Sequence, residues 1–166
     1  MAGALSPCME VGDLVIAKSI HGEVDGPCDG ELFQKTATLA GTRTDVHIST
    51  CVPADEIVWR ADDKAALARS VGGDYLFVDM ESAGIAPICR EYGVPFVIVR
   101  AISDSAEESL PFDLNRCRNR SGEISPVRVA GHALIRPSSL RRLQDLRARC
   151  IDGSRKLAEF VAGLLA

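Results

Sequence analysis

Two acidic patterns in the middle of the chain could do chemistry on a bound small molecule. Asp79-Met80-Glu81 follows one apolar run, and Ser103-Asp104 ends another. A carboxylate can accept two hydrogen bonds at once, as recognition of a ribose 2′,3′-diol requires, and Glu81 suits that role. If the protein holds Asp104 protonated, this residue could give a proton to N7 of a departing purine, so that the base leaves as a neutral molecule.

A structural role explains the same residues. Acidic residues at strand ends are common in α/β proteins, where they cap the following helix. On that view Asp79 and Glu81 cap a helix, and Asp104 begins a loop. Arg100 would then pair with one of these carboxylates. Spacing alone favours this structural role.

The elements around these residues follow the order of an α/β fold. Short apolar runs predict four strands: 13–17, 46–50, 75–78 and 95–99. Helical periodicity with end signals predicts three helices: 31–40, 61–71 and 82–92. Residues 75–99 are interpreted as a βαβ unit with parallel strands, whose carboxyl ends meet at the edge where ligands bind. Both acidic patterns are therefore expected at one edge of a sheet.

The second half of the chain changes character after residue 106. Residues 107–137 are polar and contain several Pro and Gly, so we expect a long loop with a short helical piece. From residue 138 onward, apolar residues at helical spacing with arginines opposite predict one long helix or two short ones. Such a helix could rest on a membrane surface as a peripheral contact, but covering the sheet is the favoured role.

Composition excludes several classes of protein. The 166 residues, 46% of them hydrophobic and 25% charged, suit a single domain over 1–166, and a net charge of -4 does not favour nucleic acid. The chain has neither a signal-peptide pattern nor the roughly 20 apolar residues of a membrane span, so a cytoplasmic protein is expected. Six dispersed cysteines and three dispersed histidines predict reduced thiols and no metal site.

Residues 78–104, VDMESAGIAPICREYGVPFVIVRAISD, resemble the signature of the nucleoside phosphorylase and nucleosidase superfamily, which contains the methylthioadenosine/S-adenosylhomocysteine nucleosidases. The shared features are a strand ending in Met-Glu, a helix beginning with small residues, Gly-x-Pro-Phe, and a strand ending in Arg-x-x-Ser-Asp. The resemblance implies a three-layer αβα fold around a mostly parallel or mixed sheet. It also implies cleavage of the N-glycosidic bond of an adenosine-type nucleoside by phosphorolysis or hydrolysis. No cofactor is implied, and phosphate is a candidate co-substrate.

The resemblance also assigns roles to single residues. Met80 would contact the ribose face, and Glu81 would bind its hydroxyls. Asp104 would be the acid at N7, with Ser103 positioning it. Arg100 would lie near the attacking water or phosphate.

Weaker similarities cover more of the chain. Residues 12–17 are similar to an early strand of the family. Residues 55–58 fall where a base-binding segment is expected, so Ile57 and Val58 would flank the purine. Ordinary apolar packing explains these two residues equally well. The Arg-rich C-terminal stretch and the Glu81-Ser82 pair are most similar to the hopanoid-associated phosphorylases, which release adenine from an adenosylated triterpenoid.

The chain departs from the family at its beginning. The family normally starts with strands that supply a Gly-rich phosphate turn and an acidic residue that orients water, and neither is found here. Residues 1–5 resemble the end of a later small-residue turn. We therefore expect an N-terminally incomplete fold with exposed strand edges, weak turnover and a tendency to form a homo-oligomer.

Two other functions stay open at this stage. The chain could be a catalytically incomplete nucleoside-binding or oligomerising remnant that keeps Glu81 and Asp104. It could also be an unrelated α/β signalling domain that holds Mg²⁺ with Asp79, Glu81 and Asp104. Release of free base, nucleoside binding without turnover, and metal-dependent binding would separate the three.

Overall fold

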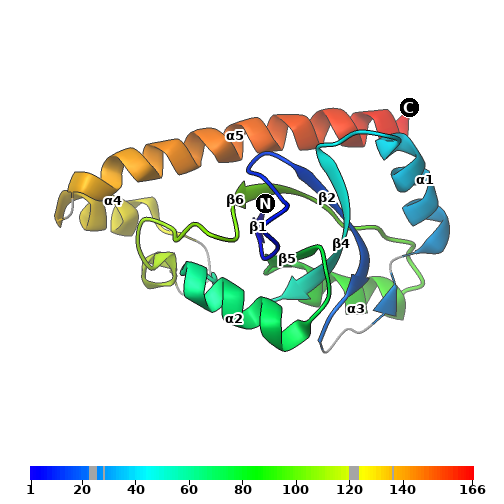
Figure 1. Ribbon diagram of the computed structural model, residues 1–166, viewed down its shortest axis with the longest axis horizontal. Coiled ribbons are helices and arrows are strands. Elements are labelled where there is room, and N and C mark those ends of the chain that lie inside the picture. Colours follow the sequence, from blue (N-terminus) through cyan, green and yellow to red (C-terminus); the bar gives the residue numbers. More distant parts are fainter. Residues whose placement is uncertain (23–25, 28, 120–123, 136) are drawn as a thin grey trace.

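The structure is a computed structural model that describes residues 1–22, 26–27, 29–119, 124–135 and 137–166. Its strands are β1 (Ala2–Ala4), β2 (Leu14–Ile20), β3 (Gly26–Pro27), β4 (Val46–Pro53), β5 (Leu76–Asp79) and β6 (Val99–Asp104). Its helices are α1 (Gly30–Ala40), α2 (Ala61–Val71), α3 (Ser82–Glu91), α4 (Pro126–Ile135) and α5 (Pro137–Leu165), with a 3-10 turn η1 (Leu114–Cys117). In Figure 1, α5 runs along one side of the sheet, and α2 and α3 lie on the opposite side.

The expected α/β class with a mixed sheet is confirmed, and the three helices predicted before residue 100 are correct to within one residue. Helix α2 shows why its ends could be read from the sequence. Asp62 and Asp63 lie in its first turn, where the helix dipole favours negative charge, and Gly72 ends it with a positive φ of 73°. The sequence also places turn residues at 28–30, directly before α1, and residue 28 lies outside the described part of the chain.

The sheet is closed on itself. The strand order is β3-β2-β4-β5-β1-β6, and β6 pairs again with β2. Strands β2, β4 and β5 run parallel to one another, whereas β6 runs antiparallel to β2 and parallel to β1. Five strands therefore form a ring, and the first half of β2 has partners on both sides. The sequence predicts exposed strand edges, and this prediction is wrong for the ring. The β2–β6 pairing gives hydrogen-bond partners to backbone groups that an open sheet would leave exposed.

The segment from β5 to β6 is not the parallel unit expected from the sequence. Strand β6 begins at Val99, so the strand predicted at 95–99 was placed too early. The carbonyl groups of residues 96 and 98 instead accept hydrogen bonds from the backbone N–H groups of Asp29 and Ala17. Strand β6 runs antiparallel to β5, with β1 between them. Apolar residues continue from 95 to 102 with Arg100 as the one interruption, so hydrophobicity alone did not show where the strand pairing starts.

The first residues form a strand rather than the small-residue turn expected for 1–5. In β1, Gly3 pairs with Val78 of β5 on one side and with Asp104 of β6 on the other. A Cβ atom at Gly3 would lie 3.1 Å from Asp104 Oδ2 and 3.3 Å from Val78 Cγ1. Glycine therefore permits the close approach of the three strands. This strand places the end of β5 beside the end of β6.

Helix α5 covers the sheet, as favoured from the sequence. It is one helix of 29 residues, and its Phe160, which is 4% exposed, packs with Leu14 and Ile16 of β2 and Ala101 of β6. The stretch expected as a long loop is more helical than predicted, because it contains η1 and α4; residues 120–123 and 136 lie outside the described part. None of the helices in the described residues is long and apolar enough to cross a membrane.

We predict that Phe160→Ala lowers the free energy of unfolding by about 3–5 kcal/mol, because it leaves a cavity between α5 and the sheet. Val161 is the matched control, since it lies next to Phe160 in the same helix but is 36% exposed. Val161→Ala should cost less than about 1 kcal/mol. Urea unfolding followed by circular dichroism measures both values. Equal losses would contradict the covering role of α5.

Candidate active site

A cavity of about 310 Å³ lies where β5, β1 and β6 meet, which is within the size range of ligand-binding pockets. All of the predicted site residues except Arg100 line it: Ile57, Val58, Met80, Glu81, Ser103 and Asp104. Much of the remaining wall is apolar and comes from the N-terminal residue, from the segment after β6 and from α5: Met1, Leu110, Leu114, Ile124, Leu146 and Cys150. The cavity thus combines carboxylates with an apolar lining.

Asp104 is almost enclosed, with its side chain 8% exposed. The Ser103 hydroxyl donates a hydrogen bond to Asp104 Oδ1 over 2.6 Å, which is the contact that the expected positioning role needs. The other oxygen, Oδ2, forms an ion pair with the ammonium group of Lys64. Both carboxylate oxygens are therefore held by neighbouring side chains.

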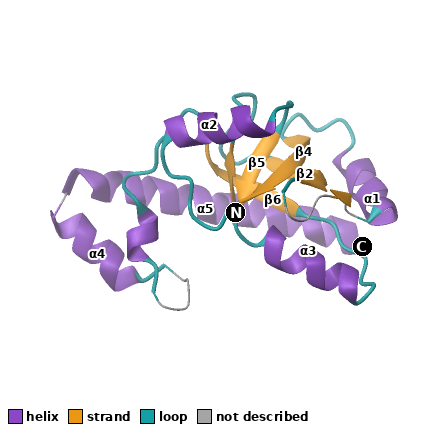
Figure 2. Ribbon diagram, turned by 90° about the horizontal axis from the view of Figure 1, so that it is seen from below, coloured by secondary structure: helices purple, strands orange, loops and turns teal. Residues whose placement is uncertain are grey.

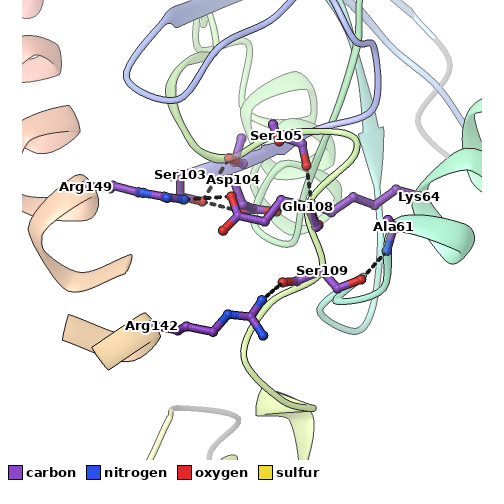
Figure 3. A network of polar contacts seen from close by, with 10 residues as sticks. Ala61, Lys64, Ser103, Asp104, Ser105, Glu108, Ser109, Arg142 and Arg149 are labelled. Carbon is purple, nitrogen blue, oxygen red and sulfur yellow. Dashed lines mark hydrogen bonds and ion pairs between the residues drawn. The ribbon is translucent and has the colours of Figure 1, made fainter. Parts of the chain in front are cut away.

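Lys64 is the main residue that the sequence analysis missed. It lies in α2 and is 0% exposed, and it also donates to the carbonyl oxygens of Ser105 and Glu108 over 2.7 and 2.9 Å. Figure 3 shows its side chain reaching from α2 to Ser105 and Glu108, in the loop that follows β6. The helical periodicity of residues 61–71 could have indicated that this lysine is buried. Lys64 occupies the same face as residues 67, 68 and 71, which pack against the core, so a charged side chain at this position is placed on the buried side.

Arg100 follows the structural role considered from the sequence. Its Nε donates to Asp79 Oδ2 over 2.8 Å, and its Nη2 lies 3.2 Å from Glu81 Oε2. Asp79 in turn accepts hydrogen bonds from the backbone N–H and hydroxyl of Ser82, so it caps α3. Glu81 makes no such cap, and its side chain is 57% exposed. Arg100 therefore contacts the site through Glu81 and does not itself line the cavity.

Cys51 lies behind this group of charges. Its thiol is buried and donates to Asp79 Oδ1 over 3.4 Å. Burial strongly raises the pKa of the Cys51 thiol, and the negative charge of Asp79 raises it further. The sulfur is therefore kept as a neutral thiol, and it contributes to packing rather than to nucleophilic chemistry.

The expected base-binding segment is held from the far side of the cavity. Asn115 of η1 binds both backbone groups of Ile57: the Ile57 N–H donates to its Oδ1 over 2.8 Å, and its Nδ2 donates to the Ile57 carbonyl over 2.9 Å. Two more hydrogen bonds tie residues 59–61 to the loop after β6, from Ala61 N to Ser109 Oγ and from Leu110 N to the Trp59 carbonyl. The two segments thus form one wall.

Helix α5 fastens the same loop from the opposite side. Arg149 forms an ion pair with Glu108 at 2.7 Å, and Arg142 donates to the Ser109 carbonyl over 2.6 Å, as Figure 3 shows. These arginines therefore hold the segment that follows Asp104.

In the described ranges, no group of three or more His, Cys, Asp or Glu side chains is arranged to hold a metal ion. Asp79 and Glu81 already share the guanidinium of Arg100. The geometry therefore gives no support to the Mg²⁺ alternative.

Comparison with known proteins supports the family resemblance. The sequence model of the phosphorylase superfamily matches residues 1–125. The chain belongs to this superfamily. Its relatives include 5′-methylthioadenosine/S-adenosylhomocysteine nucleosidases, of which two are described. The protein from Anoxybacillus flavithermus is 28% identical over 77% of this chain and 65% of its own length. The protein from an Exiguobacterium species is 32% identical over 68% of this chain and 57% of its own. The chain thus spans less than two thirds of these relatives.

Solved structures show a similar fold over 99% of this chain. The 5′-methylthioadenosine/S-adenosylhomocysteine nucleosidase of Helicobacter pylori with butyl-thio-DADMe-Immucillin-A has a TM-score of 0.69 and 17% identity, covering 99% of this chain and 65% of its own. The futalosine hydrolase of the same organism has a TM-score of 0.69 and 17% identity, covering 99% and 64%. At these identities the likeness shows the fold.

We predict that Cys51 stays unmodified when the folded protein meets a thiol reagent at mildly alkaline pH, because its raised pKa keeps it protonated and it is buried. Cys8 is exposed and serves as the internal control. Peptide mass spectrometry after labelling should find Cys8 modified first, and Cys51 modified only after denaturant is added. Rapid labelling of Cys51 in the folded protein would contradict the buried contact with Asp79.

Proposed function

We propose that the cavity binds a purine nucleoside of the adenosine type and that the protein hydrolyses its N-glycosidic bond. The observation that carries the proposal is the placement of Glu81 and Asp104 on one cavity beside Met80, Ile57 and Val58. The names of the relatives, which are nucleosidases, point to the same reaction.

The two carboxylates suit the two halves of a nucleoside. Glu81 is exposed enough to meet a ligand, and Arg100 holds one of its oxygens at 3.2 Å, so it can accept hydrogen bonds from ribose hydroxyls. Asp104 is enclosed and oriented by Ser103. Once it has taken up a proton from solvent, it can deliver that proton to N7 as the base departs, and Lys64 then pairs with the carboxylate that is left. The apolar residues Ile57 and Val58 would contact the faces of the base. The sugar would pass through an oxocarbenium-like state.

Water is proposed as the nucleophile because the named relatives are nucleosidases. An assay of adenine release from methylthioadenosine and adenosine, with and without phosphate, tests the proposal. Phosphate-dependent release would favour phosphorolysis, and binding without release would favour the non-catalytic remnant.

We predict that Asp104→Asn lowers kcat for adenine release by about 10²–10⁴-fold while the affinity for nucleoside changes little, because the substitution removes a proton needed in the transition state. Asp62→Asn is the control, since that side chain is 89% exposed. Steady-state kinetics and calorimetric binding measure the two effects. A drop in kcat below roughly tenfold would be too small for a general acid.

We predict that Glu81→Gln weakens binding of adenosine much more than binding of 2′-deoxyadenosine, since the lost acceptor acts on the hydroxyl that the deoxy compound lacks. Glu31→Gln, on the exposed first turn of α1, is the control. Calorimetric titration of each variant with both ligands gives the ratio of affinities. If the two affinities fell equally, Glu81 would act on something other than that hydroxyl.

A further inference from the structure

Lys64 of α2 is a cation that is buried inside the protein. Its side chain is completely enclosed, and the three N–H donors of its ammonium group have three oxygen partners: Asp104 Oδ2 and the carbonyls of Ser105 and Glu108. A lysine is rarely buried unless its charge is paired, because transfer of the ammonium group out of water is costly. All three donors point to Asp104 or to the loop that directly follows it.

The same contacts fix the orientation of the Asp104 carboxylate. Lys64 donates to Oδ2 and the Ser103 hydroxyl donates to Oδ1, so each oxygen of the carboxylate has a hydrogen-bond donor. Asp104 also lies against Gly3 of β1, which has no side chain to displace it. A proton transfer depends strongly on the placement of the donor and acceptor atoms, so a carboxyl group held in one orientation is an advantage in that role. Lys64 pairs with the carboxylate that remains when the proton has left.

Lys64 also sets the start of the loop after β6. It donates hydrogen bonds to the carbonyls of Ser105 and Glu108. Helix α5 binds the same short loop, because Arg149 forms an ion pair with the Glu108 side chain and Arg142 donates to the Ser109 carbonyl. Figure 3 shows this loop between α2 on one side and α5 on the other. The next residue, Leu110, lines the cavity.

We infer that Lys64 is the positioning residue of the base side of the site: it balances the charge of Asp104, orients its carboxylate and holds the following loop against the cavity. The catalytic part of this inference rests on the proposed function. The ion pair itself does not, so it can be tested without any turnover.

The first experiment is a thermal unfolding cycle on the 166-residue chain. Lys64→Met and Asp104→Asn should each lower the melting temperature, by an amount on the order of 10 °C, because each leaves one buried group without its ionic partner. The double variant should melt several degrees above Lys64→Met, since Asn no longer carries the unpaired charge. Lys35→Met, an exposed lysine of α1, is the control and should not change the melting temperature.

The second experiment measures adenine release by the wild-type protein and the same four variants. Lys64→Met should lower kcat by at least tenfold with a change in KM below about threefold, because orientation of the acid matters most in the transition state. In the Asp104→Asn background, Lys64→Met should lower kcat by less than about threefold, because the group that it positions is gone. A merely structural lysine would lower kcat by the same factor in both backgrounds.

The two readouts separate the possible failures. A double variant no more stable than Lys64→Met would overturn the ion pair, whatever the activity. Wild-type kcat in a folded Lys64→Met variant, or equal losses in both backgrounds, would overturn the positioning role. If the wild-type protein releases no adenine, the proposed function fails, and the melting cycle still decides whether Lys64 balances the charge of Asp104.

Discussion

The three-residue strand β1 is the constraint on which the cavity depends. It pairs antiparallel with β5 and parallel with β6, and its Gly3 stands between Val78 and Asp104. Because glycine has no side chain there, Asp104 can approach within 3.1 Å of where a Cβ would lie. Met80 and Glu81, which directly follow β5, are thereby brought to the same cavity as Asp104 although β5 and β6 run in opposite directions. The second pairing of β2 with β6 then closes the ring that holds this junction.

Charge balance around the junction follows one pattern on both sides. Arg100 bridges Asp79 and Glu81, and Lys64 pairs with Asp104. A buried ion pair such as Lys64–Asp104 adds little net stability over apolar packing, but loss of one partner is costly. Their value here is geometric. Each cation fixes the direction of a carboxylate, leaving Glu81 exposed to a ligand and Asp104 enclosed.

The walls of the cavity come from segments that are far apart in the chain. Asn115 holds Ile57 from η1, Ser109 holds the start of α2, and the arginines of α5 hold residues 108 and 109. Figure 2 shows α5 running past the strands toward α4, so that one helix supports both the sheet and the loop after β6. A change in α5 can therefore be felt at Asp104 without touching it. This network joins the fold to the proposed chemistry.

The sequence by itself determined the local features of this protein. Amphipathic periods, helix-end signals and short apolar runs are properties of neighbouring residues, so α2 was predicted at its observed bounds and α1 and α3 to within one residue. The pattern of residues 78–104 was also enough to indicate the superfamily, and the residues it pointed to line one cavity, apart from Arg100. Only the tertiary structure decided the direction of β6, the role of β1 as a strand and the ion pair of Lys64 with Asp104. Strand pairing and buried ion pairs depend on contacts between residues that are distant in the chain. Lys64 and Asp104 are 40 positions apart, and nothing in a single sequence indicates that they are in contact.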